Sequence, residues 1–300
     1  MVIEEDFKQK CLSQWNDGDI LDDRLSFFYN KYEEWKKQIP EEHIDVILTL
    51  LERLQYYTKK RVNCILVDLH KQLQSDSNYT INNTVFAYIK SSDGISNSSN
   101  DYWTEYKQLN KLNRQICYEN LNAIEEKAWD YIENIVFIDD FSGSGKSIEN
   151  EISKYTDQFK GKNVYIITVC AMETAIYNLK EFGKTHSINI RFIYSQIFKK
   201  AFEENYFSNN SEAKDKYLLF AKSKNISLAL GFENTEALVS FYNNTPNNTL
   251  GFIRYNSDTY FSLFPRINDK KPIWQTQKLD SLKRRVTERK NANYNNSCSY

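Results

Sequence analysis

IVFIDDFSGSGKSI, residues 135–148, is the stretch on which the interpretation of this chain depends. Four apolar residues, Ile135–Ile138, predict a buried strand. A run of glycine and serine follows two aspartates, and the apolar spacing over Ser147–Phe159 then predicts a helix. The segment therefore predicts a strand, a tight loop and a helix, with polar groups gathered where the strand ends.

The residues of this loop suit a sugar phosphate. Asp139 and Asp140 are adjacent carboxylates at the end of a buried strand, so they repel each other and need sugar hydroxyls or a metal as partners. Glycines let a backbone approach an anion closely, hydroxyls add donors, and a helix beginning near Lys146 supplies free N–H groups. The residues predicted to hold the phosphate are Ser142, Gly143, Ser144, Gly145, Lys146 and Ser147.

Strands and helices alternate after the loop. Val164–Val169 and Ile188–Tyr194 are apolar runs that predict two further strands, and Ala171–Phe182 between them predicts a helix. Mostly apolar strands that alternate with helices indicate a parallel sheet covered on both faces. We therefore expect the α/β class, with ligands bound at the carboxyl ends of the strands.

Helices dominate the sequence before this sheet. Leu21–Gln38, Glu41–Tyr57 and Val62–Leu73 carry apolar residues at helical spacing. We expect residues 1–75 to form an N-terminal helical region, and Val85–Ile89 to be the first short strand of the domain that follows.

Fainter patterns lead to the remaining predictions. Trp103–Ile132 and Thr235–Tyr242 are predicted to be helical, and Thr245–Tyr255 is predicted to be a turn that leads into a strand. We expect the α/β domain to span residues 76–268, followed by a basic tail over residues 269–300 that is partly disordered.

The strand and loop resemble the signature of the type I phosphoribosyltransferases: four apolar residues, two acidic residues, and a Thr/Ser–Gly loop that opens a helix. The resemblance implies that Asp139 and Asp140 hold the ribose hydroxyls, that Gly143–Ser147 hold the 5′-phosphate, and that phosphoribosyl pyrophosphate or a nucleotide binds with Mg²⁺ near the two aspartates. The hypoxanthine–guanine enzymes have an aspartate near the purine base where this chain has Gly143. Purine salvage is therefore in doubt, and no general base is identifiable.

Gly-Lys-Ser at the end of the loop raises the alternative of a P-loop ATPase or kinase. That motif requires a glycine five residues before Gly145, and this chain has Asp140 there. A carboxylate fits poorly where the backbone must wrap phosphates. A chance Gly/Ser turn is the remaining alternative.

A second resemblance covers most of residues 20–266. The strand and Ser-rich loop YIKSSDGISNSS, the loop DDFSGSGKS, and the later NNTPNNT and LFPR segments resemble phosphoribosyltransferase-like effectors of bacterial conflict and antiphage systems, some of them encoded beside retron reverse transcriptases. The resemblance implies a toxin-like effector restrained by partner proteins, such as a reverse transcriptase–msDNA complex. A non-catalytic nucleotide sensor that uses the same site is the alternative.

Several polar residues outside the loop are candidates for the same pocket. Lys90 and Ser91 follow the strand Val85–Ile89, where the corresponding loop of phosphoribosyltransferases contacts pyrophosphate. Asn247 or Asn248 in TPNNT is predicted to line the pocket. Arg266 is predicted to bind an anion. Each of these residues has the alternative of an ordinary solvated surface position.

The charge pattern restricts contact with nucleic acid to one segment. The chain has a net charge of −1, so no global basic field favours nucleic acid. Asp269–Lys290, however, holds eight Lys/Arg against three acidic residues. This tail is a candidate contact for RNA or DNA, a docking segment for a partner, or a solvated helix.

The remaining composition argues for a cytoplasmic protein. Five scattered cysteines and three separated histidines show no metal-ligand spacing, and the cysteines fit reduced thiols. The first residues, MVIEEDFKQK, lack the apolar stretch of a signal peptide, and no run is long enough to span a membrane. We therefore expect a soluble chain that makes no membrane contact.

Overall fold

Four parallel strands form the central sheet, in the spatial order β2-β3-β4-β5. In the computed structural model these strands span Thr84–Tyr88 (β2), Asn134–Ser142 (β3), Asn163–Met172 (β4) and Asn189–Phe198 (β5). The apolar strands β3 and β4 lie in the middle and are almost entirely buried, whereas β5 at the edge is half-buried. The predicted α/β class with a parallel sheet is confirmed.

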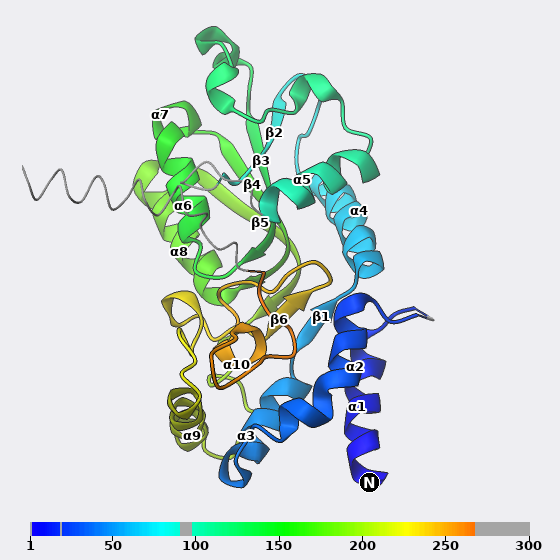
Figure 1. The fold of residues 1–300 in the computed structure, drawn as a ribbon. Helices are drawn as coiled ribbons and strands as arrows, with labels where there is room; N and C mark the ends of the chain where they lie inside the picture. The colour runs from blue at the N-terminus through cyan, green and yellow to red at the C-terminus, as the bar shows by residue number, and fades with distance from the viewer. Residues whose placement is uncertain (1, 19, 91–97, 268–300) are drawn as a thin grey trace, which may run out of the picture. The chain divides into compact units, whose positions relative to one another are not determined.

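Helices cover both faces of this sheet (Figure 1). Ile135 and Phe137 of β3 point to one face and pack with α6, α7 and α8. Val136 and Ile138 point to the other face and pack with α4 and α5, because side chains alternate along a strand. The helices span Lys59–Asp76 (α4), Ser98–Leu109 (α5), Lys146–Ile152 (α6), Thr156–Phe159 (α7) and Glu173–His186 (α8).

A second core joins the two ends of the described chain. Its short parallel sheet pairs β1, Gln55–Tyr57, with β6, Val239–Phe241. Buried residues of the N-terminal helices, such as Trp35 and Leu50, pack in one cluster with Tyr217 and Phe252 from the C-terminal part. The helices of this region span Val2–Trp15 (α1), Asp23–Lys36 (α2), Glu41–Glu52 (α3), Asn210–Ser223 (α9) and Gly251–Arg254 (α10).

Not all of the chain is described. Met1–Arg266 form one compact unit, which contains every element named above. Ser91 and the basic tail of residues 269–300 lie outside the described residues. No described helix combines the length and the apolar character needed to cross a membrane. The described ranges are 2–18, 20–90 and 98–267.

The helix predicted over Trp103–Ile132 is wrong for most of its length. Helix α5 ends at Leu109, and Lys111 adopts a left-handed φ of 49°. The side chains of Asn113 and Asn120 then accept backbone N–H groups and begin short 3-10 helices instead. These 3-10 helices span Arg114–Ile116 (η1), Leu121–Ala123 (η2) and Glu126–Asp130 (η3).

Two predictions in the C-terminal part are also wrong. The helix predicted over Thr235–Tyr242 is absent, because Glu236 has a left-handed φ of 54° and the next residues pair with β1 as strand β6. The strand predicted within Thr245–Tyr255 is absent as well, and α10 occupies its place. Pairing with a distant strand or a left-handed residue decides the structure of these segments. The spacing of apolar residues along the sequence indicates neither.

Candidate functional site

A tight loop joins the buried strand β3 to helix α6. The strand ends at Ser142 and the helix begins at Lys146. Gly145 caps the helix with a φ of 83°, in the left-handed region that L-residues with a Cβ disfavour. Its carbonyl accepts the N–H of Glu149 at 2.9 Å, the first bond of the helix. The glycine at position 145 is therefore needed for the backbone conformation itself.

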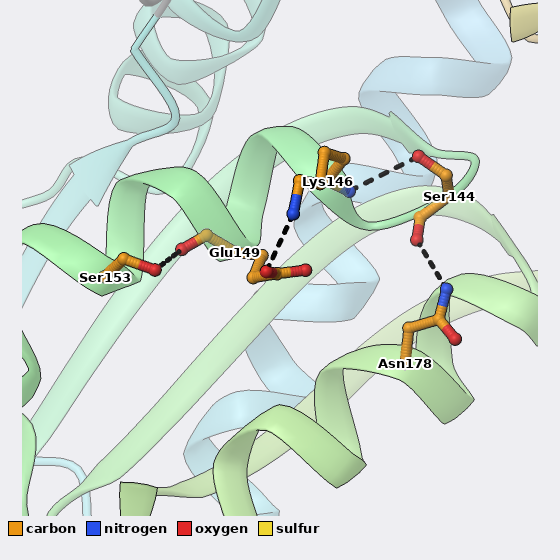
Figure 2. A network of polar contacts seen from close by, with 5 residues as sticks. All are labelled: Ser144, Lys146, Glu149, Ser153 and Asn178. Atoms are coloured by element: carbon orange, nitrogen blue, oxygen red, sulfur yellow. Dashed lines mark hydrogen bonds and ion pairs between the residues drawn. The ribbon is translucent and has the colours of Figure 1, made fainter. Parts of the chain in front are cut away.

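Polar contacts hold this loop in place, as Figure 2 shows. Asn178 on α8 donates from Nδ2 to the carbonyl oxygen of Ser144 at 3.1 Å. Ser144 Oγ in turn accepts the backbone N–H of Lys146 at 3.3 Å. The Lys146 side chain pairs with Glu149 at 2.9 Å, and this contact raises the pKa of the lysine. The loop is therefore shaped by its neighbours before any ligand is present.

Two adjoining pockets open beside the loop. The smaller has a volume of about 150 Å³ and is lined mainly by residues 141–148. The larger has a volume of about 320 Å³ and includes Asp139 and Asp140 in its wall. The two pockets share part of their lining and therefore lie next to each other. The shared residues are Asp139, Phe141, Ser147, Asn247 and Asn248.

Asp139 is a buried carboxyl group in an unfavourable environment. Its side chain is only 8% exposed, and Oδ1 accepts the backbone N–H of Asp140 at 3.0 Å. Burial, followed by the charge of Asp140, raises the pKa of Asp139 well above its ordinary value. Asp140 is half-buried and accepts a hydrogen bond from Ser98 Oγ at 3.1 Å. Without a ligand, ionisation of the Asp139 carboxyl group is therefore unfavourable.

The Ser142 hydroxyl lacks a partner. The residue is 2% exposed and lines the smaller pocket, and no described residue forms a hydrogen bond with Oγ. A buried hydroxyl without a partner costs about 1–3 kcal/mol. A ligand oxygen in the smaller pocket would remove that cost, which makes Ser142 a binding candidate on grounds of its environment.

Comparison with known proteins places the chain in a family. The model of the PRTase-CE family matches residues 32–266 of the 300. The chain belongs to the PRTase-CE family. It is thus a phosphoribosyltransferase-like protein. One solved structure that it matches, the xanthine-guanine-hypoxanthine phosphoribosyltransferase of Helicobacter pylori, is 14% identical with a TM-score of 0.31, and the match covers 48% of this chain and 90% of that one. No curated protein matches the chain.

The structure of this PRTase-CE protein brings the described candidate residues together. Residues 142–147 line the smaller pocket, and Asp139 lies in the wall that both pockets share. Asp140, Lys90 and Arg266 line the larger pocket. Asn247 and Asn248 lie in the shared wall, whereas Ser91 is outside the described residues. The roles assigned to these residues stay predictions.

Sequence reasoning missed one polar face of the site. Asn150 and Glu151 on α6, and Lys154 in the 3-10 helix Ser153–Tyr155 that follows it, line the larger pocket. Glu151 is 3% exposed and pairs with Lys154 at 2.6 Å, so the pocket wall contains a buried carboxylate and a cation. Asn150, Glu151 and Lys154 follow Ser147 by three, four and seven residues, and this spacing was a usable signal because residues at these spacings share a helix face. Phe232, Ser98 and Asn244 had no comparable signal.

The N-terminal helices of this PRTase-CE protein hold the Asn-rich loop in place. Arg24 on α2 donates to Thr245 Oγ1 at 2.5 Å and to the carbonyl of Pro265 at 3.1 Å. Arg266 donates from Nη1 to the carbonyl of Thr245 at 2.8 Å. Burial lowers the pKa of the Arg24 guanidinium. Thr245 and the asparagines that follow it are therefore fixed by both ends of the described chain.

Proposed function

We propose that the chain binds a 5-phosphoribosyl ligand, either phosphoribosyl pyrophosphate or a nucleotide, across the two adjoining pockets. The observation that carries this proposal is the pairing of a small Gly/Ser pocket, which holds the unpartnered Ser142 hydroxyl, with a neighbouring wall of two aspartates. In this proposal residues 142–147 bind the 5′-phosphate, and Asp139 and Asp140 bind the ribose hydroxyls. Ribose hydroxyls would add hydrogen-bond donors to this carboxylate pair, in which Asp139 is buried and Asp140 half-buried.

Mg²⁺ fits the residues of the larger pocket. In the described ranges, no group of three or more acidic, histidine or cysteine side chains is arranged for a metal ion. Mg²⁺ is usually held by one or two carboxylates together with ligand phosphates and water, so a complete protein cage is not required. Asp140, which lines the larger pocket, would supply the first carboxylate and Asp139 the second. When bound, the ion would neutralise phosphate charge.

The larger pocket also carries positive charge for a second anionic group. Lys90, Lys154 and Arg266 contribute to its wall. In this proposal they take the pyrophosphate or a further phosphate, since cationic side chains form strong hydrogen bonds with phosphate oxygens. A departing pyrophosphate would be stabilised by the same charges, and the protein would mainly position the ribose.

Calorimetric titration tests the proposal. Phosphoribosyl pyrophosphate with Mg²⁺ should bind the wild type and should lose at least about 100-fold in affinity in Asp139→Asn/Asp140→Asn, because two charged hydrogen-bonding groups are removed. Asp68→Asn, which changes an exposed carboxylate on α4, is the matched control and should bind normally. Equal affinity in the wild type and the folded double variant would refute the proposed ribose site.

Turnover separates the alternatives that share this site. An enzyme should consume the ligand, whereas a nucleotide sensor should bind it and release it unchanged. A P-loop ATPase should instead hydrolyse ATP and lose that activity in Lys146→Ala. The Lys146 side chain is held by Glu149, as Figure 2 shows, and Asp140 stands where a P-loop requires a glycine, so these residues favour the phosphoribosyl interpretation over the P-loop one.

We further propose that the protein is a toxin-like effector of bacterial antiphage defence, in keeping with the resemblance to such effectors. A retron reverse transcriptase–msDNA complex or another partner would restrain it, with the basic tail as a candidate contact for nucleic acid. Expression of the chain without partners in a bacterium should reduce colony formation, and Asp139→Asn/Asp140→Asn should abolish that effect. Equal colony numbers for wild type and an empty vector, at matched protein levels, would refute intrinsic toxicity.

A further inference from the structure

Asn248 occupies the space that a side chain on the phosphate loop would need. A Cβ added at Gly143 would lie 2.3 Å from Cγ and 2.6 Å from Oδ1 of Asn248. Gly143 does not have a left-handed φ, unlike Gly145. Glycine is therefore required at position 143 for space, because the Asn248 carboxamide lies directly against the loop backbone.

The carboxamide is held in one orientation. Nδ2 of Asn248 donates to Thr235 Oγ1 at 2.8 Å and lies 3.4 Å from the carbonyl oxygen of Phe232. The Thr235 hydroxyl donates its own proton to that same carbonyl. Because the Thr235 hydroxyl uses its proton in this way, Thr235 Oγ1 can only accept a hydrogen bond from Asn248. The NH₂ end of the Asn248 carboxamide therefore faces residues 232–235.

The backbone around Asn248 is equally fixed. Its carbonyl accepts the N–H of Ala237 at 3.2 Å, and the carbonyl of Asn247 accepts the N–H of Phe232 at 2.8 Å. At Gly231 a Cβ would approach the Asn248 carbonyl oxygen to 2.0 Å, so the two segments are in close backbone contact. The backbone position of Asn248 is thus fixed by its contacts with residues 231–237.

The oxygen end of the carboxamide remains available to a ligand. The residue is 9% exposed and lies in the wall shared by the two pockets. No described residue donates a hydrogen bond to Oδ1, whereas Nδ2 is fully engaged. Asn248 Oδ1 is therefore a fixed acceptor without a donor, in the wall that both pockets share. Such an acceptor is suited to bind an O–H or N–H group of a ligand.

We propose that Asn248 is a specificity-determining binding residue, whose Oδ1 accepts a hydrogen bond from an uncharged hydroxyl or amino group of the ligand where the two pockets join. This inference rests on the proposed phosphoribosyl site and assigns a selective contact within it. The preferred ligand thus carries a neutral donor next to its bound phosphate.

A carboxylate would serve poorly at this position. Aspartate at residue 248 would lose the NH₂ that Thr235 accepts and would place another negative charge in the wall that contains Asp139. A buried charge without a partner is costly, whereas the carboxamide is neutral at every pH. Asparagine at position 248 therefore provides a hydrogen-bond acceptor that carries no charge and does not take up a proton.

Paired ligands test this contact. Ribose 5-phosphate has hydroxyl groups that can donate hydrogen bonds. Methyl phosphate has no such group, since its phosphate is a dianion at pH 8. Asn248→Leu keeps a side chain of similar shape against Gly143 but has no acceptor. We expect Asn248→Leu to bind ribose 5-phosphate roughly 3- to 10-fold more weakly than the wild type, the usual effect of losing one hydrogen bond. Its affinity for methyl phosphate should be unchanged. Thr235→Val, which frees the carboxamide to rotate, should produce a smaller loss in the same direction.

The outcomes distinguish this proposal from the one on which it rests. Equal affinity of the wild type and Asn248→Leu for ribose 5-phosphate would overturn the role of Asn248 while leaving the phosphoribosyl site intact. An equal loss for both ligands would also overturn it, because it would show a general effect on the loop. If the wild type binds neither ligand, the proposed function and the role of Asn248 fail together.

Discussion

Asp139→Asn is expected to stabilise the protein by about 1–3 kcal/mol at neutral pH, a large effect for one substitution. Burial, followed by the Asp140 carboxylate, raises the pKa of Asp139 in the folded chain. At neutral pH the carboxyl group ionises freely in the unfolded chain, whereas burial opposes its ionisation in the folded chain. This difference lowers the free energy of unfolding. Asparagine is neutral, keeps the Oδ1 acceptor for the Asp140 N–H, and supplies an NH₂ in place of the carboxyl proton.

The pH dependence gives this prediction its sign. A carboxyl group whose pKa is higher in the folded state binds more protons there, so stability falls as the pH rises from the ordinary value of 3.8 through the raised pKa. Urea unfolding of the wild type should show this fall, and Asp139→Asn should remove most of it. Asp101→Asn is the matched control, because burial and Asp140 also raise the pKa of Asp101, which is less buried. Its effect should be smaller and in the same direction.

A less stable Asp139→Asn variant at neutral pH, or one with an unchanged pH slope, would show that Asp139 is favourably ionised in the ligand-free protein. The stabilised outcome would indicate that the aspartate is retained for binding at the expense of folding. That pattern is expected of functional carboxylates, which are placed where a ligand, and not the protein, completes their contacts.

The strand, loop and helix of the site were predictable because their signals are local. Four apolar residues require burial, and Gly145 permits a left-handed turn. The helix begins at Lys146, close to the predicted start, but it ends at Ile152 and two short helices replace its predicted continuation to Phe159. The strand runs on to Ser142, so Asp139 and Asp140 lie within its last four residues and not after its end. Each of these features depends on neighbours within a few residues, which a single sequence displays.

The opposite wall of the site depends on distant contacts that the sequence does not display. Strand β6 forms because β1, far away in the sequence, pairs with it. Thr245 is held by Arg24 from the N-terminal helices. Asn248 acquires its position only where the loop brings Gly143 against it. The sequence therefore suggested the asparagines by composition but contained no signal for their orientation or partners.

Gly145→Ala is expected to abolish ligand binding at the loop and to destabilise the protein by about 2–5 kcal/mol. A φ of 83° costs a residue with a Cβ roughly 1–2 kcal/mol, and overpacking adds about 1–3 kcal/mol. The new Cβ would lie 3.0 Å from both Cγ and Cδ1 of Leu179, which is fully buried on α8. The loop would have to move away from α8, and the positions of its N–H groups would change.

Gly161→Ala is the matched control, because Gly161 has a φ of 75° and a Cβ there would meet no atom within 4 Å. It isolates the backbone penalty, so we expect a loss of only about 1–2 kcal/mol with normal binding of phosphoribosyl pyrophosphate. Urea unfolding and calorimetry on both variants separate the two contributions.

Leu179→Ala provides the remaining comparison. If the contact with Leu179 causes the extra loss, Gly145→Ala should cost less in the Leu179→Ala background than in the wild type, a coupling that a double-mutant cycle measures. Additive losses would assign the whole effect to the backbone. Normal ligand binding by a folded Gly145→Ala variant would mean that the loop tolerates displacement, and the phosphate would then have to bind elsewhere in the two pockets.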